Sequence, residues 1–350
     1  MFFSNWIFDL NRFKKILLFI AFIIGNGSFT YIISQDPVFT QFYNAPLQIN
    51  PAFAGNTYAP MVHLNTRLEW PAIGLAYNTY SFSVDRFFHD YNFGSGLLIT
   101  MDNSGNGIYK RFRAEGVFSY RLKIRDKRYM KMGLSLAYGQ NTLDWQKLVF
   151  GDEIDPRYGY VLPDGTKLPT GEVQPDDLTV GYLDISAGIL FYSKELYFGI
   201  AVKHANTPVD YYNNKQNTVN AGLPVRVTAQ IGGEFDMFPN YGGERKYYTP
   251  SLLFAGQSGL YQIVFDNHID LGAIFAGIGY RWNIVNSDAV LFSVGMSKEM
   301  FKISYSFDYT VSKLGIGSGG SHEVGVSINF DKSTLFKAPY RYSDCFNMFR

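Results

Sequence analysis

The fold is decided by one stretch near the carboxyl terminus, Phe301-Lys302-Ile303-Ser304-Tyr305-Ser306-Phe307-Asp308-Tyr309-Thr310-Val311. Large apolar side chains occupy its odd-numbered positions, whereas polar or small side chains occupy the even-numbered ones. A period of two residues is typical of a β-strand whose two faces meet different surroundings. This stretch therefore predicts a strand with one face suited to lipid and the other suited to water.

Segments of this kind recur along the chain from Met61 onward. We expect strands near residues 61–70, 77–86, 93–102, 108–122, 128–143, 183–192, 196–204, 224–235, 247–256, 260–269, 271–282, 288–297, 300–311 and 322–330. Their second face is rich in Gly, Ala and Ser instead of the Lys, Glu and Thr that cover a soluble sandwich, and small residues suit a crowded barrel interior. The sequence thus predicts an all-β fold, a transmembrane antiparallel β-barrel of the bacterial outer membrane with about 14 strands.

The lengths of the links between these segments predict the sidedness of the barrel. Four tight links follow even-numbered strands, at Lys123 to Lys127, Ser193 to Glu195, Asp270, and Lys298 to Glu299. The long links at Asp144 to Tyr182, Ala205 to Leu223, and Ser312 to Ser321 follow odd-numbered strands, and the link from Asp236 to Lys246 is the one rather long turn after an even-numbered strand. Because such barrels have short periplasmic turns and longer extracellular loops, we expect the long links outside the cell and both termini in the periplasm.

The composition agrees with a membrane barrel and excludes several other classes. The 350 residues are 47% hydrophobic and only 17% charged, below the usual charged share of about 25%. A mean hydropathy of −0.07 is far too low for a bundle of membrane helices. The net charge of +1 gives no general attraction to nucleic acid. The single cysteine, Cys345, excludes an intrachain disulfide and a multi-cysteine metal site.

The amino terminus has the order of a secretory signal. Lys14 and Lys15 precede an apolar run at residues 16–24, which is long enough for a signal sequence and too short for a membrane helix. We therefore expect a cleaved signal peptide over residues 1–34. The remaining domain boundaries that we expect are a periplasmic or lumen-packing segment at 35–58, the barrel at 59–331, and a periplasmic tail at 332–350.

The sequence offers little catalytic or metal-binding chemistry. It contains no G-x-S-x-G, phosphate-binding glycine loop or H-E-x-x-H pattern. Ser321, His322 and Glu323 are consecutive on a predicted strand, so they point to alternate faces and cannot form a triad. Acidic residues gather in the longest link around Asp152 and Asp177, but their spacing matches no EF-hand, and a solvated loop is the favoured interpretation. We expect no enzymatic activity, no cofactor and no metal.

Charged side chains on the water-facing side of the strands are the candidate lumen residues. Alternation places Arg67, Lys302 and Asp308 there. Asp308 lies about 20 Å along its strand from Lys302 but only about two strand spacings, roughly 10 Å, from Arg67. A pairing of Arg67 with Asp308 is therefore the hypothesis for this face. A network that only stabilises the barrel and an open aqueous path are both compatible with such charges.

Two motifs resemble a known family. The first runs Gln35-Asp36-Pro37-Val38-Phe39-Thr40-Gln41-Phe42-Tyr43-Asn44-Ala45-Pro46-Leu47-Gln48-Ile49-Asn50-Pro51-Ala52-Phe53-Ala54-Gly55, and the second is Gly320-Ser321-His322-Glu323-Val324. Together they resemble the PorP/SprF family of the type IX secretion system of Bacteroidota. The candidate family-motif residues are Gln35, Asp36, Pro37, Asn50, Pro51, Gly55, Ser321, His322 and Glu323.

The resemblance implies a non-enzymatic outer-membrane component that assists the export or surface attachment of a partner adhesin or other secreted protein, with a connection to gliding motility. It also implies contact with outer-membrane lipid and with other type IX secretion components. A diffusion porin or small-molecule uptake channel is the alternative that the residues leave open. The opening motif carries Pro37, Pro46 and Pro51 among large apolar residues, so we expect it to be irregular and to pack inside the lumen or against a periplasmic partner.

Overall fold

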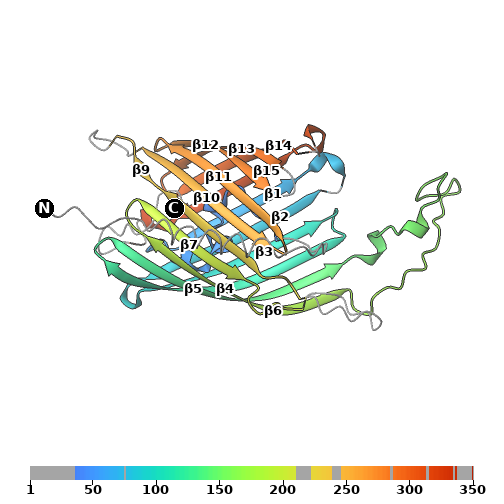
Figure 1. Ribbon diagram of the computed structural model, residues 1–350, viewed down its shortest axis with the longest axis horizontal. Coiled ribbons are helices and arrows are strands. Elements are labelled where there is room, and N and C mark those ends of the chain that lie inside the picture. The colour runs from blue at the N-terminus through green and yellow to red at the C-terminus, as the bar shows by residue number, and fades with distance from the viewer. Residues whose placement is uncertain are drawn as a thin grey trace, which may run out of the picture. The chain divides into compact units, whose positions relative to one another are not determined.

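The computed structural model describes residues 36–74, 76–209, 222–238, 246–283, 287–312 and 315–333, together with Phe336 and Phe349. Within these residues the chain forms one closed antiparallel β-sheet (Figure 1). Each wall strand pairs with its neighbours in the sequence. The ring closes where β1 pairs with β15, from Met61 opposite Asn329 to Glu69 opposite Ser321. The predicted transmembrane barrel is confirmed.

The wall has fourteen strands in the described part of the chain, as predicted. They are β1 (Met61–Glu69), β2 (Tyr77–Phe88), β3 (Phe93–Ser104), β4 (Tyr109–Arg125), β5 (Arg128–Leu143), β6 (Thr179–Tyr192), β7 (Leu196–Lys203), β8 (Arg226–Gly233) with its short continuation β9 (Phe235–Asp236), β10 (Tyr247–Gln257), β11 (Leu260–Asp270), β12 (Ile274–Asn283), β13 (Ser287–Lys298), β14 (Phe301–Thr310) and β15 (Ser321–Asn329). Both β8 and β9 pair with β10, so they count as one wall strand interrupted at Glu234.

The two ends of the barrel differ in their connections. The link between β5 and β6, residues 144–178, projects far from the wall at the right of Figure 1. We call this the long-loop end. At the opposite, short-turn end, only Asp126 and Lys127 join β4 to β5. Met61 and Asn329, the first and last residues of the wall, both lie at the short-turn end, because each strand reverses direction.

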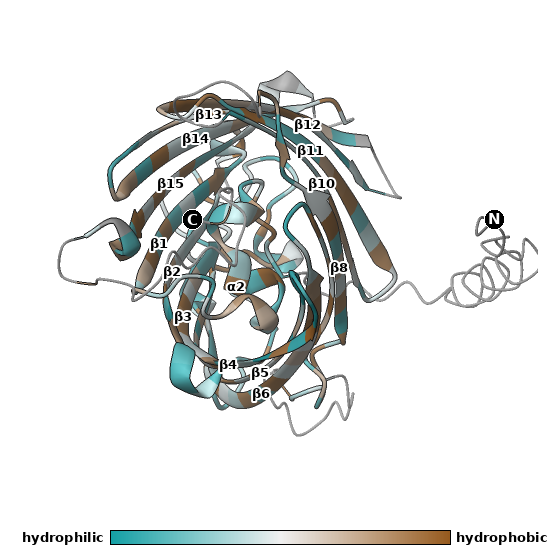
Figure 2. Cartoon of the chain, turned by 90° about the vertical axis from the view of Figure 1, so that its left-hand side faces the viewer, coloured by the Kyte–Doolittle hydropathy of each residue, from teal (hydrophilic) through white to brown (hydrophobic). Residues whose placement is uncertain are grey.

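Burial along the wall strands is the reverse of that in a soluble protein. On β14, Phe301, Ile303 and Tyr305 are 42–49% exposed, whereas Lys302 and Asp308 are at most 9% exposed. Apolar and polar bands alternate along the strands in Figure 2. Because the sheet is closed, the exposed apolar face can meet lipid while every strand keeps two hydrogen-bonded neighbours. No helix among the described residues is long and apolar enough to span a membrane.

Residues 36–58 fill the lumen, and we call them the plug. They fold into three short turns of helix, η1 (Phe42–Asn44), α2 (Pro46–Ile49) and η2 (Pro51–Phe53). The prolines at the starts of α2 and η2 keep these helices short, because proline cannot continue a preceding helix. Figure 2 shows α2 inside the ring of strands. The apolar side chains that needed burial are 0–2% exposed, at Phe39, Phe42, Tyr43, Leu47 and Phe53.

Glycines in the wall allow the plug to approach the sheet closely. A Cβ at Gly133 would overlap the backbone nitrogen of Ala52, and a Cβ at Gly94 would overlap the carbonyl oxygen of Ala54. By contrast, a Cβ at Gly116 would meet no atom closer than 3.9 Å. Gly94 and Gly133 on the inner face therefore make room for the main chain of the plug inside the barrel.

The plug runs through the lumen from one end to the other. Its first described residue, Asp36, contacts residues at the long-loop end, whereas directly after the plug the backbone N–H of Ala59 donates to the Asp331 carboxylate at the short-turn end, at 2.6 Å. Link lengths place only the wall strands. They say nothing about a segment inside the lumen, so the position of Asp36 at the long-loop end does not follow from them.

Phe349, the last described residue, also packs at the short-turn end. Its ring lies 4.8 Å from that of Phe53 and 5.2 Å from that of Tyr197, which is the second residue of β7. Phe349 is 1% exposed. Most of the expected tail at 332–350, like the expected signal peptide at 1–34, lies outside the described residues.

Candidate functional site: the plugged lumen

Asp308 is the centre of a buried cluster that joins the plug to the wall. Its carboxylate accepts hydrogen bonds from Arg67 Nη2 and Arg281 Nη1, each at 2.8 Å, and from the hydroxyl of Thr40 in the plug at 2.8–2.9 Å. The side chains of Asp308, Arg67 and Arg281 are 2–5% exposed. We call Thr40, Arg67, Arg281, Asp308 and Glu323 the Asp308 cluster. The contact between Arg67 and Asp308 spans strands β14, β15 and β1.

Glu323 binds the backbone of the plug. One carboxylate oxygen accepts from the backbone N–H of Thr40 and the other from that of Gln41, both at 2.9 Å. Arg67 Nη1 lies 3.1 Å from the same carboxylate. Since Glu323 is 1% exposed, these charge-assisted hydrogen bonds are shielded from water, which strengthens them.

Lys302 lies further along the lumen and meets aromatic rings. Its Nζ is 5.1 Å from the ring centre of Tyr43 in the plug and 4.9 Å from that of Phe275 on β12. Both distances suit a cation–π interaction. Lys302 and Asp308, which share a strand face, thus interact with different parts of the plug.

Asp36 lies in a second buried cluster on the far side of the lumen. Its carboxylate is 2.8 Å from Arg111 Nη1, 2.6 Å from His204 Nε2 and 3.7 Å from Arg226 Nη1. Its backbone N–H donates to Gln257 Oε1 at 3.0 Å. These four partners lie at the long-loop ends of β4, β7, β8 and β10, and with Asp36 they form what we call the Asp36 cluster.

The charge of Asp36 is set by these partners. Burial by itself would raise the pKa of the Asp36 carboxyl, but His204, Arg111 and Arg226 together hold that pKa well below its usual value. Asp36 is therefore an anion at neutral pH. Its negative charge draws the start of the plug toward the basic side of the wall.

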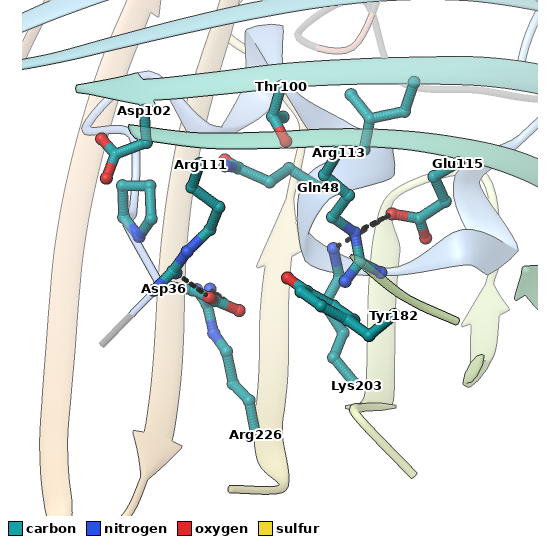
Figure 3. A pocket seen from close by; sticks show the side chains of 12 residues that line it. Asp36, Gln48, Thr100, Asp102, Arg111, Arg113, Glu115, Tyr182, Lys203 and Arg226 are labelled. Atoms are coloured by element: carbon teal, nitrogen blue, oxygen red, sulfur yellow. Dashed lines mark hydrogen bonds and ion pairs between the residues drawn. The ribbon is translucent and has the colours of Figure 1, made fainter. Parts of the chain in front are cut away.

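A small cavity adjoins the Asp36 cluster (Figure 3). Its volume is about 30 Å³, enough for a water molecule or a small group. Its charged lining residues are Asp36, Asp102, Arg111, Arg113, Glu115, Lys203 and Arg226. Arg113 is 8% exposed; its Nη1 contacts Asp184 and its Nε donates to Glu115 at 3.1 Å. The Nη2 of Arg113 has no hydrogen-bond partner among the described residues.

The plug is anchored again near the short-turn end. The backbone N–H of Gly55, where φ is +72°, donates to Asp85 at 2.6 Å. Lys131 Nζ donates to the carbonyl oxygen of Ala54 at 2.6 Å, and the hydroxyl of Ser119 donates to the same oxygen at 2.7 Å. A Cβ at Gly55 would lie 2.7 Å from the backbone of Gly94, so the position requires glycine for space as well as for its backbone angle.

Asn50 fixes the middle of the plug. Its side-chain oxygen accepts from the backbone N–H of Ala52 at 2.9 Å and so begins η2, in which Pro51 is the first residue. Its side-chain amide donates to the carbonyl oxygens of Ile189 on β6 and Ile200 on β7, at 3.2 and 3.3 Å. The same side chain thus shapes the plug and joins it to two wall strands.

The remaining motif residues have separate positions. Gln35 lies outside the described residues, and Pro37 lines the cavity beside Asp36. Ser321 lies opposite Asp308 in the sheet. His322 is on the outer face, where its Nδ1 lies 2.7 Å from the hydroxyl of Tyr305. The alternation that separates Ser321, His322 and Glu323 is therefore present in the structure.

A different serine, histidine and aspartate do approach one another. Ser293 Oγ lies 2.9 Å from His268 Nε2, and His268 Nδ1 lies 3.3 Å from Asp266. However, His268 Nδ1 makes no hydrogen bond among the described residues, and the ring of Tyr43 covers the imidazole at 4.8 Å. A triad needs a base oriented by its carboxylate and a nucleophile that substrate can reach. This arrangement supplies neither.

The acidic link between β5 and β6 uses its carboxylates internally. Asp152 accepts from the backbone N–H of Gly171 at 2.7 Å, and this bond is the main reason why the pKa of Asp152 is lowered. Asp155 accepts from the backbone N–H groups of Arg157 and Tyr158 at 2.7 and 2.9 Å. The described residues contain no group of three or more acidic, histidine or cysteine side chains arranged to hold a metal ion.

Sequence reasoning placed Arg67 and Asp308 on the lumen face but missed most of their surroundings. The strand alternation that located Arg67 could also have located Arg281. It could not show that Thr40 and Asp36, from an irregular segment, are the groups that complete the two clusters. The apolar character and three prolines of that segment were the available signal.

Comparison with known proteins places this plugged barrel in a family. The family described as "Type IX secretion system membrane protein PorP/SprF" matches residues 32–328, which include the plug and nearly the whole wall. The chain belongs to the PorP/SprF family. The closed barrel and this match together identify an outer-membrane protein associated with type IX secretion. Within the PorP/SprF chain, both clusters and the anchor of the plug fall inside the matched residues.

Solved structures that resemble this PorP/SprF protein are other outer-membrane barrels. The toluene transporter TbuX of Ralstonia pickettii is 10% identical, with a TM-score of 0.48, over 81% of this chain and 92% of TbuX. The KdgM porin in complex with disordered oligogalacturonate is 10% identical, with a TM-score of 0.37, over 77% of this chain and 99% of KdgM. Likenesses this distant concern the fold alone. No curated protein matches the chain.

Proposed function

We propose that this protein is a non-enzymatic component of type IX secretion that assists the export or surface attachment of a partner adhesin or other secreted protein. Its partners would be that cargo, other type IX secretion components and outer-membrane lipid. Export through a cleaved signal peptide at residues 1–34 belongs to the same proposal, as does a position of the long-loop end outside the cell.

One observation carries the proposal beyond family membership. Residues 36–58 fill the lumen and are held at both ends. Near the long-loop end the wall residues Asp308 and Glu323 bind the plug, and the plug residue Asp36 binds the wall. Near the short-turn end the wall residues Asp85 and Lys131 bind the plug. A diffusion porin needs a continuous aqueous path, and a segment pinned by buried charge pairs is costly to displace. The arrangement supports a protein that presents surfaces to partners more than one that passes small solutes.

Deletion of the gene tests this proposal against the porin alternative. We expect the deletion strain to lose one or a few proteins from the cell surface, to recover them when the intact gene is supplied, and to take up small nutrients at the normal rate. Surface proteins would be measured by labelling intact cells, and uptake by radiolabelled solutes. Normal surface proteins with a general loss of permeability would reject the secretion role and support the porin.

A further inference from the structure

The Asp36 cluster has the composition of a binding site for a carboxylate. Three different donors from three strands converge on a single carboxylate, namely Arg111 on β4, Arg226 on β8, and His204 directly after β7. Arginine and histidine in this arrangement are the usual means by which proteins recognise a carboxylate. The carboxylate that fills the site belongs to the plug and not to the wall.

The wall charges around the site do not balance without Asp36. The wall contributes four cations, and His204, whose two ring nitrogens face the carboxylates of Asp36 and Asp184, adds a fifth when it is protonated. The cations are Arg111, Arg113, Lys203 and Arg226. Among the described residues the wall carboxylates that face them are Asp102, Glu115 and Asp184, and Glu115 and Asp184 are already bound by Arg113 and Lys203. Asp36 supplies the fourth negative charge, so its removal would leave a buried excess of positive charge.

A second observation indicates that a further hydrogen-bond acceptor could bind beside the Asp36 carboxylate. The cavity of about 30 Å³ adjoins Asp36 and is lined in part by Arg113, whose Nη2, on a side chain about nine-tenths buried, has no hydrogen-bond partner among the described residues. A buried guanidinium N–H without a partner is costly and is rare in folded proteins. Figure 3 shows Arg111, Arg113 and Arg226 around this space, with Asp36 between Arg111 and Arg226.

We propose that the long-loop end of the barrel contains a receptor site for a carboxylate ligand. Arg111, His204 and Arg226 form this site, with Arg113 beside them, and Asp36 occupies it as an internal substitute when no ligand is present. A ligand carboxylate that enters from the long-loop end would displace Asp36 and free the start of the plug. The inference deepens the proposed function, because it names the chemical group by which a peptide partner would be recognised.

The site can be tested without any secretion assay, by chemical rescue of the purified full-length barrel. Asp36→Gly removes the carboxylate and leaves room for an added one. We expect this variant to unfold at a lower temperature than the wild type, and sodium acetate to raise its midpoint more than sodium chloride of equal ionic strength does. Each tenfold excess of acetate over its Kd should raise the midpoint by about 2 to 5 °C. The wild type should not distinguish the two salts.

A matched control tests whether the stabilisation by acetate occurs at the proposed carboxylate site. Asp36→Gly combined with Arg111→Gln lacks the nearest guanidinium and should lose the specific response to acetate. Should Asp36→Gly not fold, Asp36→Asn keeps the shape of the side chain without its charge and should still respond to acetate more than the wild type does. Equal shifts with acetate and chloride in both single variants would overturn the receptor site. The proposed secretion role would stand or fall separately, by the gene deletion.

Discussion

Substitution of Asp308 tests whether the lumen is a closed, paired interior. Its carboxylate receives two guanidinium groups at 2.8 Å and the hydroxyl of Thr40, and its side chain is 2% exposed. Breaking a buried pair of this kind costs about 3–5 kcal/mol, because the remaining partner is left charged and dry. Asp308→Ala should therefore lower the free energy of unfolding by about that amount, although Arg67 keeps Glu69 and Glu323 as neighbours.

The assay is urea unfolding of the purified barrel, followed by the shift between its folded and unfolded bands on unboiled gels. Asp126→Ala is the matched control, because Asp126 forms an exposed pair with Lys123 at 3.6 Å in the turn between β4 and β5. Such pairs contribute less than about 1 kcal/mol, so this variant should resemble the wild type.

A double-mutant cycle separates the pair from its surroundings. Arg67→Met and Asp308→Ala, measured alone and together, should show a coupling of about 0.5–3 kcal/mol, because the two side chains are in direct contact. A cost below about 1 kcal/mol for Asp308→Ala, together with altered ion selectivity in planar bilayers, would show that water surrounds Asp308 and that the lumen is open. The plug would then not close the lumen.

Three further predictions concern the plug and the sidedness of the barrel. Gly133→Val should push the main chain at Ala52 away from the wall and raise the conductance of the barrel in planar bilayers. At Gly116 a Cβ meets nothing closer than 3.9 Å, so the barrel of the Gly116→Val variant should stay closed. Equal conductance of the two variants would contradict the close packing at Gly133. Because the pKa of Asp36 is lower in the folded protein, its stabilisation is complete above its unfolded pKa of about 3.9 and is lost as the pH falls through the folded value. Melting midpoints below about pH 4 should therefore fall less in Asp36→Asn than in the wild type, and parallel curves would reject this assignment. A tag at Gly171 should react with impermeant reagents on intact cells and a tag after Arg350 should not, while the opposite labelling would reverse the barrel.

The sequence by itself determined the wall. Alternation with a period of two is a local property of each strand, so Phe301 and Asp308 could be assigned to opposite faces from their positions alone. Link lengths then fixed the parity of the strands, and closure of an even-numbered sheet followed from the absence of water to satisfy a free edge in lipid. The pairing hypothesis for Arg67 and Asp308 needed only this neighbour order and the spacing between strands.

The tertiary structure alone decided what fills the lumen inside the wall. The plug has no period, because its prolines break both helix and strand, so nothing local tells which of its side chains meets which strand. Asp36 meets Arg111 and Arg226, and Thr40 meets Asp308, only because the closed sheet brings strands distant in sequence around one segment. Which end of the lumen Asp36 reaches depends on the shape complementarity of a folded interior, which includes glycines such as Gly133 that admit main chain. Such complementarity is a property of the packed whole and is not written in any one segment.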